Sequence, residues 1–257
     1  MTNMILSGCC GKMGQVITRL AEEAGDPRIV CGFDVSGASG SYPIFSEPAD
    51  FTGEADVIVD FSHPSAFERL TVYAYERKIP LVMCTTGLSH GQREQLEALS
   101  HSVPVFFSAN MSLGVNLLIE LVQTAAKLLY KNFDIEIIEK HHNKKIDAPS
   151  GTALAIADAI SDCLPVEFEY MLDRHSQRRS RDKNEIGLHS VRGGTIVGDH
   201  SVLFAGQDEI IEISHHAASK EIFAAGALRA AQFMHGKPAG MYTMRDLVQS
   251  VAGEQNL

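Results

Sequence analysis

Two adjacent histidines and three lysines occur between Glu139 and Ala153, in a chain of 257 residues with a formal net charge of −10. The segment from Lys140 to Lys145 contains no acidic residue. Imidazoles exchange protons near neutral pH, and ammonium groups bind anions. This combination suits a site that holds an anion and moves protons, although a solvated basic loop would have the same composition.

The neighbouring elements bring this stretch to the beginning of a helix. Residues 133–138 alternate between apolar and polar side chains, which predicts a strand with one buried face. Residues 154–160 are typical of a helix, and Pro149, Ser150 and Gly151 precede it. Unpaired N–H groups at a helix start attract anions. We therefore predict a site for a small, multiply anionic substrate.

A second candidate site follows the first strand. Gly8, Gly11 and Gly14 come after the apolar residues 4–7, and a periodic helix and a second strand lead to Asp34. Glycines let the backbone approach a pyrophosphate, the helix start attracts it, and the acid can hold a ribose diol. This context indicates dinucleotide binding rather than a merely tight turn.

Strands and helices alternate through the first 110 residues, with further strands predicted at 57–61, 81–84 and 103–107. The alternation predicts an α/β fold with a doubly wound parallel sheet, whose ligands bind at the carboxyl ends of the strands. The residues predicted at that rim are Asp34, Phe61, Thr85, Thr86 and Ser108 to Met111.

The pattern changes in the second half. Runs at 194–204 and 209–216 predict an open, mixed sheet with one buried face, whose edge would pair with another subunit. Residues 165–187 are irregular and rich in arginine, which predicts a solvated excursion. Final helices are expected at 220–234 and 244–251.

The composition limits the classes of function. The negative charge argues against nucleic acid as a partner, and no apolar run approaches the ~20 residues of a membrane span. No signal-like segment begins the chain, and the five cysteines form no CxxC pair. We therefore expect a reduced, cytoplasmic protein. No HExxH motif and no Cys/His zinc-ligand spacing occurs in the sequence, so we expect no metal site.

The cysteines near the glycine turn could be reactive. Cys9 and Cys10 lie beside a helix start, which lowers the pKa of a thiol, and Cys84 is expected on the same rim. Alkylation would then inactivate the protein, and bound nucleotide would slow it. The alternative is that these thiols only fill space.

The sequence His-His-x-x-Lys-x-Asp-Ala-Pro-Ser-Gly-Thr-Ala, from His141 to Ala153, resembles the signature of the 4-hydroxy-tetrahydrodipicolinate reductase (dihydrodipicolinate reductase) family. The resemblance covers almost the whole chain. Further matching motifs are Gly8 to Gly14, Thr85-Thr86-Gly87, Arg192-Gly193-Gly194, Gly198-Asp199-His200 and segments 223–227 and 240–244.

The resemblance implies reduction of 4-hydroxy-tetrahydrodipicolinate to tetrahydrodipicolinate by NAD(P)H, on the diaminopimelate route to lysine. It makes His141 the general acid/base, His142 a substrate contact and Lys145 the proton donor. Gly151 and Thr152 would bind a carboxylate of this small dicarboxylate. The implied cofactor residues are Gly8, Cys9, Cys10, Gly11, Lys12, Met13, Asp34, Cys84, Thr85, Thr86, Ser108, Ala109, Asn110 and Met111.

The resemblance also implies two domains. Residues 1–110 and 219–257 would form a Rossmann-like dinucleotide-binding domain, and residues 111–218 a smaller α+β domain for substrate binding and tetramerisation. The expected assembly is a homotetramer joined through sheets of the second domain.

Three residues depart from the pattern common in the family: Lys12 replaces an arginine, Cys84 a glycine and Met111 a phenylalanine. They bear on cofactor preference rather than on the reaction. Asp34 would repel the 2′-phosphate of NADPH, the two residues after it carry no charge, and Lys12 would offset the repulsion only in part. We expect use of both NADH and NADPH, with NADH modestly favoured.

Two other functions are compatible with a dinucleotide site. One is a different dehydrogenase of small acids, of the aspartate or homoserine type. The other is a nucleotide-binding redox sensor without catalysis, which the intact His141 and Lys145 argue against.

Overall fold

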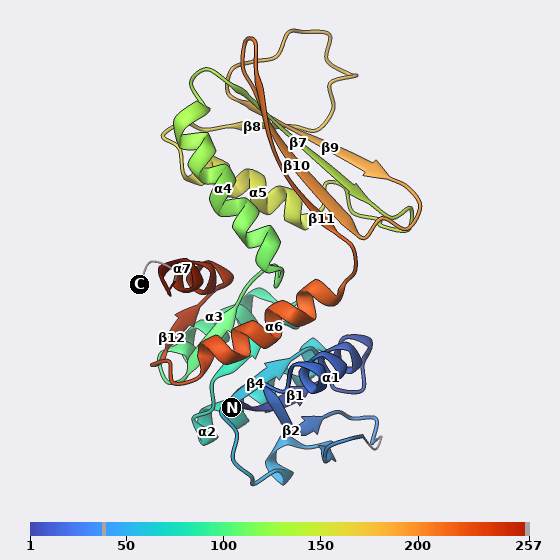
Figure 1. Cartoon of the computed structure of the whole chain (residues 1–257), viewed down its shortest axis with the longest axis vertical. Helices are drawn as coiled ribbons and strands as arrows, with labels where there is room; N and C mark the ends of the chain where they lie inside the picture. Colours follow the sequence, from blue (N-terminus) through green and yellow to red (C-terminus); the bar gives the residue numbers. More distant parts are fainter. Residues whose placement is uncertain (38–39, 255–257) are drawn as a thin grey trace. The chain divides into compact units, whose positions relative to one another are not determined.

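A computed structural model describes residues 1–37 and 40–254 (Figure 1). The chain divides into two compact units, one formed by Met1–Leu113 with Glu221–Leu257 and the other by Gly114–Lys220. Among the described residues, no helix has both the length and the apolar character needed to cross a bilayer.

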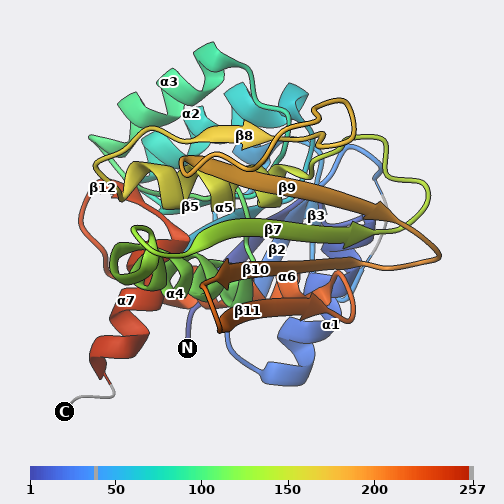
Figure 2. The same cartoon turned by 90° about the horizontal axis from the view of Figure 1, so that it is seen from above.

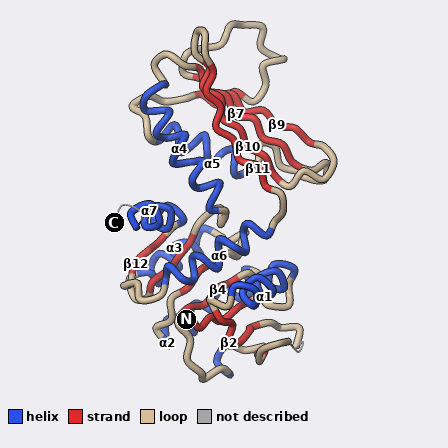
Figure 3. The backbone as a smooth tube through the Cα atoms, in the orientation of Figure 1, coloured by secondary structure: helices blue, strands red, loops and turns tan. Residues whose placement is uncertain are grey.

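The described part of the first unit holds a seven-stranded parallel sheet in the order β12-β6-β5-β4-β1-β2-β3. Its strands are β1 (Asn3–Ser7), β2 (Arg28–Phe33), β3 (Ile44–Phe45), β4 (Val57–Asp60), β5 (Leu81–Met83), β6 (Pro104–Phe107) and β12 (Gly240–Tyr242). Its helices are α1 (Lys12–Ala24), α2 (Phe67–Arg77), α3 (His90–Ser100), α6 (Glu221–Met234) and α7 (Met244–Glu254), with short 3-10 turns at Pro48–Asp50 and Pro64–Ala66. Figure 3 draws the strands in red and the helices in blue.

Successive residues of these strands serve two hydrophobic cores, one on each face of the sheet. Met4 and Leu6 of β1 pack with α1 and α6, whereas Ile5 packs with α2 and α3. Strand β4 repeats this division with Val59 and Ile58. Burial on both faces explains the nearly continuous apolar strand sequences. The predicted doubly wound parallel sheet is therefore confirmed.

The described part of the second unit holds a five-stranded mixed sheet in the order β11-β10-β7-β9-β8, which Figure 2 shows from above. Its strands are β7 (Asp134–His141), β8 (Glu169–Met171), β9 (Glu185–Arg192), β10 (Gly198–Ala205) and β11 (Ile210–Ala217). Helices α4 (Leu113–Leu129) and α5 (Gly151–Asp162) pack on one face. The predicted mixed sheet is confirmed, but β8 and β9 were missed and β10 begins four residues later than predicted.

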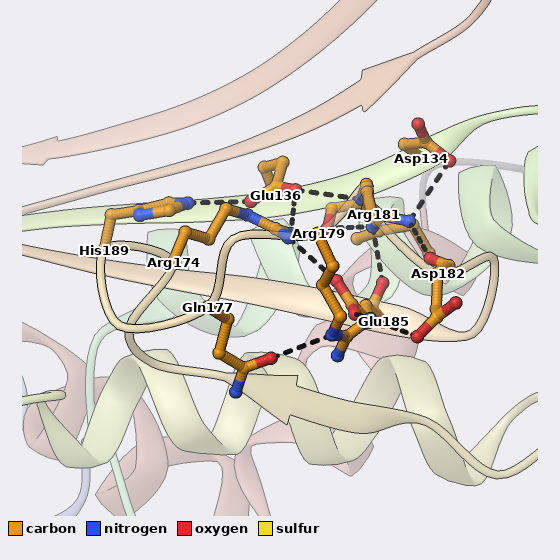
Figure 4. Close-up of polar contacts among 10 residues, drawn as sticks. Asp134, Glu136, Arg174, Gln177, Arg179, Arg181, Asp182, Glu185 and His189 are labelled. Carbon is orange, nitrogen blue, oxygen red and sulfur yellow. Dashed lines mark hydrogen bonds and ion pairs between the residues drawn. The ribbon is translucent and has the colours of Figure 1, made fainter.

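The prediction of a solvated basic excursion is wrong for Arg174, Arg179 and Arg181, which Figure 4 shows bound to acids. Arg174 lies 2.9 Å from Glu136 and 2.8 Å from Glu185, and Arg179 also contacts Glu185 at 2.8 Å. Arg181 reaches Glu136 at 3.0 Å. Burial acts to raise the pKa of Glu185, but the hydrogen bond from Arg174 and the other contacts of the carboxylate together outweigh it and the pKa is lowered. These ion pairs fasten the excursion to β7 and β9.

Helix α6 passes so close to the chain at Met111 that only glycine fits at Gly226. A Cβ atom there would lie 1.7 Å from the Met111 carbonyl oxygen. Gly91, in α3, is the matched control because its Cβ would meet no atom within 4 Å.

We predict that Gly226→Ala destabilises the protein by about 3 kcal/mol, since overpacked interiors cost about 1–3 kcal/mol or more. Gly91→Ala should instead stabilise it by about 0.5–1 kcal/mol through reduced chain entropy. Thermal unfolding followed by circular dichroism compares the two variants. An unchanged midpoint for Gly226→Ala would contradict the close packing of α6.

Candidate functional site

The carboxylate of Glu139 lies at the centre of the candidate substrate site in the second unit, only 1% exposed. Arg192 donates to both of its oxygens at 2.7 Å, and His141 Nδ1 lies 2.6 Å from Oε2. The backbone N–H of Ser150 donates to Oε1 at 3.1 Å. Burial acts to raise the pKa of Glu139, but the hydrogen bonds from Arg192 and His141 outweigh it and lower the pKa to about 2.

The strand register explains how these residues meet. Glu139 and His141 are two residues apart on β7, so their side chains lie on the same, buried face. Strand β9 runs parallel to β7, and its last residue, Arg192, is in register with His141. The N–H of Gly193 then donates to the His141 carbonyl at 2.9 Å. The arginine is therefore positioned by the sheet rather than by a flexible loop.

The ring of His141 is oriented by these contacts. Because Nδ1 faces Glu139, Nε2 is the ring atom directed away from the carboxylate. Gly198 leaves room beside it, since a Cβ there would lie 3.0 Å from Nε2. The ring of His200 packs edge-on at 5.2 Å between centroids, and burial, followed by the nearby His141, lowers the pKa of His200 to about 4. His200 is therefore neutral at pH 7.

The start of α5 lies against the same carboxylate. The Ser150 hydroxyl accepts the N–H of Ala153 at 3.1 Å, which caps the helix, and lies 3.2 Å from His200 Nε2. A Cβ at Gly151 would meet no atom within 4 Å, so the first turn is open on that side. The structure thus has room for an anionic group at the helix start that the sequence indicated.

Lys145 is placed by a turn that follows β7. Its N–H donates to the His142 carbonyl at 3.1 Å, and its Nζ lies 2.8 Å from Asp147 Oδ2. This hydrogen bond from Lys145 lowers the pKa of Asp147. Arg192 also donates to the Asp147 carbonyl at 2.6 Å, which ties the loop to β9. The sequence showed Lys145 only among other cationic side chains, and the structure adds Asp147 as its acidic partner.

Three residues of the site received no role from the sequence: Glu139, Arg192 and Ser150. The sequence did contain a signal that Glu139 belongs to the site. Glu139 has the strand spacing that puts it on the buried face with His141, and a buried carboxylate needs partners. The identity of its partner could not be read from the chain, because Arg192 is 53 residues away.

The glycine turn of the first unit is closely packed beneath α1. Gly8 has a φ of +75°, and a Cβ there would lie 2.5 Å from the Phe61 carbonyl oxygen. A Cβ at Gly14 would lie 2.3 Å from the Gly8 carbonyl oxygen. Within the described chain, no side chain caps the start of α1 at Gly11. Its first N–H groups can therefore receive a phosphate.

Asp34 lines a cavity of about 290 Å³ together with Gly8, Val35 and Arg69. Its Oδ2 accepts the N–H of Cys10 at 3.0 Å, and its Oδ1 accepts the N–H of Ser36 at 3.0 Å. Burial acts to raise the pKa of Asp34, but these backbone hydrogen bonds outweigh it and lower the pKa. Each oxygen keeps a lone pair for a ribose hydroxyl.

The other predicted rim residues differ in their surroundings. Thr85 is buried and donates to Asp60 Oδ2 at 2.6 Å, so its hydroxyl has a protein partner. The Ser108 hydroxyl donates to the Asn110 carbonyl at 3.2 Å, and Met111 packs into the core with α6. The exposed residues of the predicted set are Gly11, Lys12, Thr86 and Ala109.

The predicted lowering of the thiol pKa is wrong for Cys9, and the thiol of Cys84, expected on the same rim, is not activated either. Burial, with a further contribution from Cys10, raises the pKa of Cys9 to about 12. Burial, followed by the charge of Asp60, raises the pKa of Cys84 well above its usual value. The effect of desolvation exceeds that of the helix start. The structure therefore indicates that the thiols of Cys9 and Cys84 are unreactive towards alkylating reagents.

Comparison with known proteins identifies the family. The model of the N-terminal part of dihydrodipicolinate reductase matches residues 2–111, and that of the C-terminal part matches residues 114–248. The chain belongs to the dihydrodipicolinate reductase family. Members of this family are NAD(P)H-dependent oxidoreductases.

Two relatives and one solved structure illustrate the similarity. The 4-hydroxy-tetrahydrodipicolinate reductase of Caldanaerobacter subterraneus subsp. tengcongensis is 51% identical over 97% of this chain and 99% of its own. That of Clostridium tetani is 50% identical over 97% of this chain and 98% of its own. A dipicolinate-bound dihydrodipicolinate reductase from Paenisporosarcina sp. TG-14 has the same fold, with a TM-score of 0.79, 24% identity and coverage of 95% and 97%.

These matches favour the reductase function over the two alternatives, a dehydrogenase of another small acid and a redox sensor without catalysis. The function is the reduction of 4-hydroxy-tetrahydrodipicolinate in the lysine and diaminopimelate pathway.

Glu139 and Glu136 allow a matched test of positioning, because both are acids of β7 on opposite faces of the strand. We predict that Glu139→Gln lowers kcat about 100-fold, the effect of a small misplacement of a reacting group, because His141 and Arg192 lose their charged partner. Glu136→Gln should leave kcat within about twofold. Steady-state kinetics on both variants gives the comparison, and equal losses would contradict a specific role for Glu139.

Proposed function

We propose that the first unit binds NAD(P)H and the second unit binds 4-hydroxy-tetrahydrodipicolinate, which is reduced by hydride transfer. The single observation that carries this proposal is the buried Glu139 carboxylate. It holds the ring of His141 and the start of α5 through direct hydrogen bonds. A proton-exchanging group and an anion-binding helix start are thereby fixed in one site.

The start of α5 is the proposed carboxylate site. The N–H groups of Gly151 and Thr152 would bind one carboxylate of the substrate, and His142 would contact the ring. The open space at Gly151 and the positive end of the helix support this assignment. The dipicolinate named for the Paenisporosarcina relative is also a small dicarboxylate.

His141 and Lys145 are the proposed proton-handling residues. Hydride addition leaves a carbanion or enamine that must gain a proton. Lys145 is the proposed donor of this proton, and Asp147 orients its side chain. His141 would exchange protons through Nε2, because Nδ1 is engaged by Glu139.

The direct test is a coupled assay in which dihydrodipicolinate synthase forms the substrate from pyruvate and aspartate semialdehyde. NAD(P)H absorbance should fall only when all components are present. Oxidation of NAD(P)H by aspartate semialdehyde alone would instead identify a dehydrogenase of another acid.

Within this assay, we predict that His141→Gln and Lys145→Ala each lower kcat by ~10²–10⁴-fold, the usual contribution of a positioned acid or base. Lys144→Ala is the matched control, since this exposed neighbour has no proposed role. NADH affinity, measured by fluorescence, should be unchanged in all three variants. Near wild-type turnover in Lys145→Ala would remove that residue from the mechanism.

The cofactor preference is proposed to be dual, with NADH modestly favoured. Asp34 lines the cavity where a ribose diol would lie, and its negative charge opposes a 2′-phosphate. The structure adds a cation that sequence reasoning did not consider: Arg69 lines the same cavity, whereas Lys12 does not. Arg69 is paired with Glu47 at 2.5 Å, which weakens its attraction for a phosphate.

We therefore predict that Arg69→Ala lowers kcat/KM for NADPH about tenfold, corresponding to one charge-assisted interaction of about 1.4 kcal/mol, with little change for NADH. Lys12→Ala should also lower kcat/KM for NADPH, but by less than Arg69→Ala does. Both cofactors must be compared at one ionic strength. A wild-type preference for NADPH would contradict the proposed contact of Asp34 with the ribose.

We also propose a cytoplasmic homotetramer that joins through the sheets of the second unit, with neither nucleic acid nor membrane as a partner. The described edges of that sheet are β8 and β11, and Ile210 and Ile211 of β11 are 65% and 39% exposed. Exposed apolar strands are suited to pairing between subunits. All five cysteines are free, as expected in a reducing compartment.

A further inference from the structure

Cys9, Cys10 and Asp34 bring two sulfur atoms and a carboxylate together at the glycine turn. The two Sγ atoms lie 3.9 Å apart, and the ligand atoms of all three residues lie within 4.8 Å of one another. The carboxylate is held there because Asp34 accepts the N–H of Cys10 at 3.0 Å. The expectation of no metal site rested on the lack of a known histidine or cysteine ligand spacing, and this cluster joins two adjacent cysteines to an acid 24 residues further along the chain.

The spacing of the sulfurs matches the ligand geometry of a bound cation. With Zn–S bonds of ~2.3 Å, a tetrahedral ion separates two thiolates by about 3.8 Å. A disulfide would require the same atoms to approach to about 2.05 Å. Two thiolates and a carboxylate form a donor set that zinc and cadmium accept, and magnesium and calcium do not favour. The geometry therefore fits a bridging soft cation better than a bond between the sulfurs.

We infer that Cys9, Cys10 and Asp34 form a binding site for a soft divalent cation such as Zn²⁺, and that this ion and the dinucleotide exclude one another. On binding, both thiols release their protons to solvent, and the ion gains two thiolates and one carboxylate. The charge of the divalent ion stabilises the thiolate of Cys9 and so overcomes the burial that raises the pKa of this thiol in the metal-free protein. Water completes the coordination, and no electron is transferred. The occupied cluster carries a net charge of −1, which the adjoining start of α1 favours.

The exclusion follows from shared groups and rests on the proposed function. A carboxylate that coordinates the ion cannot hold the ribose hydroxyls, and Asp34 lines the cavity in which they would lie. Gly8 and Gly11 of the turn line it as well. An ion at Cys10 would also occupy the turn whose N–H groups would receive the pyrophosphate. The expected consequence is inhibition by the ion that is competitive with NADH.

Cadmium is the probe, because cadmium–thiolate bonds absorb in the ultraviolet and because added zinc can then displace the cadmium ion. The reduced full-length protein, without cofactor, is titrated with Cd²⁺, and one equivalent should produce the band. Cys10→Ser should weaken Cd²⁺ binding about 100-fold or more, because losing even a residue that only orients a ligand costs about 10–100-fold. Cys163→Ser is the matched control, since that thiol lies in the second unit.

Competition then tests exclusion. NADH at ten times its Kd should weaken Cd²⁺ binding about tenfold. Wild-type protein that gives no band, or Cys10→Ser protein that binds Cd²⁺ at full strength, would overturn the site. If Cys10→Ser does not fold, Asp34→Asn serves as the second variant, and unchanged Cd²⁺ affinity would again overturn it. A band that persists under NADH would overturn exclusion, whereas the metal-free coupled assay would still report on the reductase.

Discussion

The buried carboxylate of Glu139 stays charged only because three parts of the second unit supply its hydrogen-bond donors. Arg192 comes from the end of β9, His141 from β7 and the Ser150 N–H from the start of α5. Leaving such a carboxylate without partners would cost several kcal/mol. Strand register, helix start and ring orientation are therefore coupled, and a disturbance of any one of them reaches the proposed catalytic residue His141.

Strand β7 carries a second glutamate with charged hydrogen-bond donors on its other face. There Glu136 is bound by Arg174, Arg181 and His189, with the His189 contact at 2.7 Å. Gly187 of β9 makes room for this acid, since a Cβ would lie 1.6 Å from Glu136 Oε2. One short strand thus uses two acids to fix a loop on one side and the candidate site on the other.

Local patterns were sufficient to predict β1, β2, β4, β5 and β6 of the first unit and the helix that begins at Gly151. They missed the short edge strands β3 and β12. Strands buried on both faces have continuous apolar sequences, and a glycine turn between a strand and a helix is visible in the chain. Strand β9 was missed because Ser190 and Arg192 occupy the positions where apolar residues would continue the alternation begun by Ile186 and Leu188. Its place beside β7 depends on pairing between residues about 50 positions apart.

The remaining errors arose from tertiary contacts that local spacing does not reveal. The arginines of the excursion were predicted to be solvated, but Arg174 meets Glu136 across 38 residues. The thiol of Cys9 was assigned to an activating helix start, and its burial, which the sequence does not show, has the opposite effect on its pKa. Glu139 had the correct spacing, yet its partner Arg192 is visible only in the folded sheet.

The central claim is that Glu139 and Arg192 act as one unit, and a double-mutant cycle on unfolding free energy measures it most directly. The variants are Glu139→Gln, Arg192→Met and their combination. The bidentate pair predicts a coupling of about 2 kcal/mol or more, since each hydrogen bond to a charged group contributes about 1.5–3 kcal/mol. Additive losses, with a coupling below about 0.5 kcal/mol, would contradict the account.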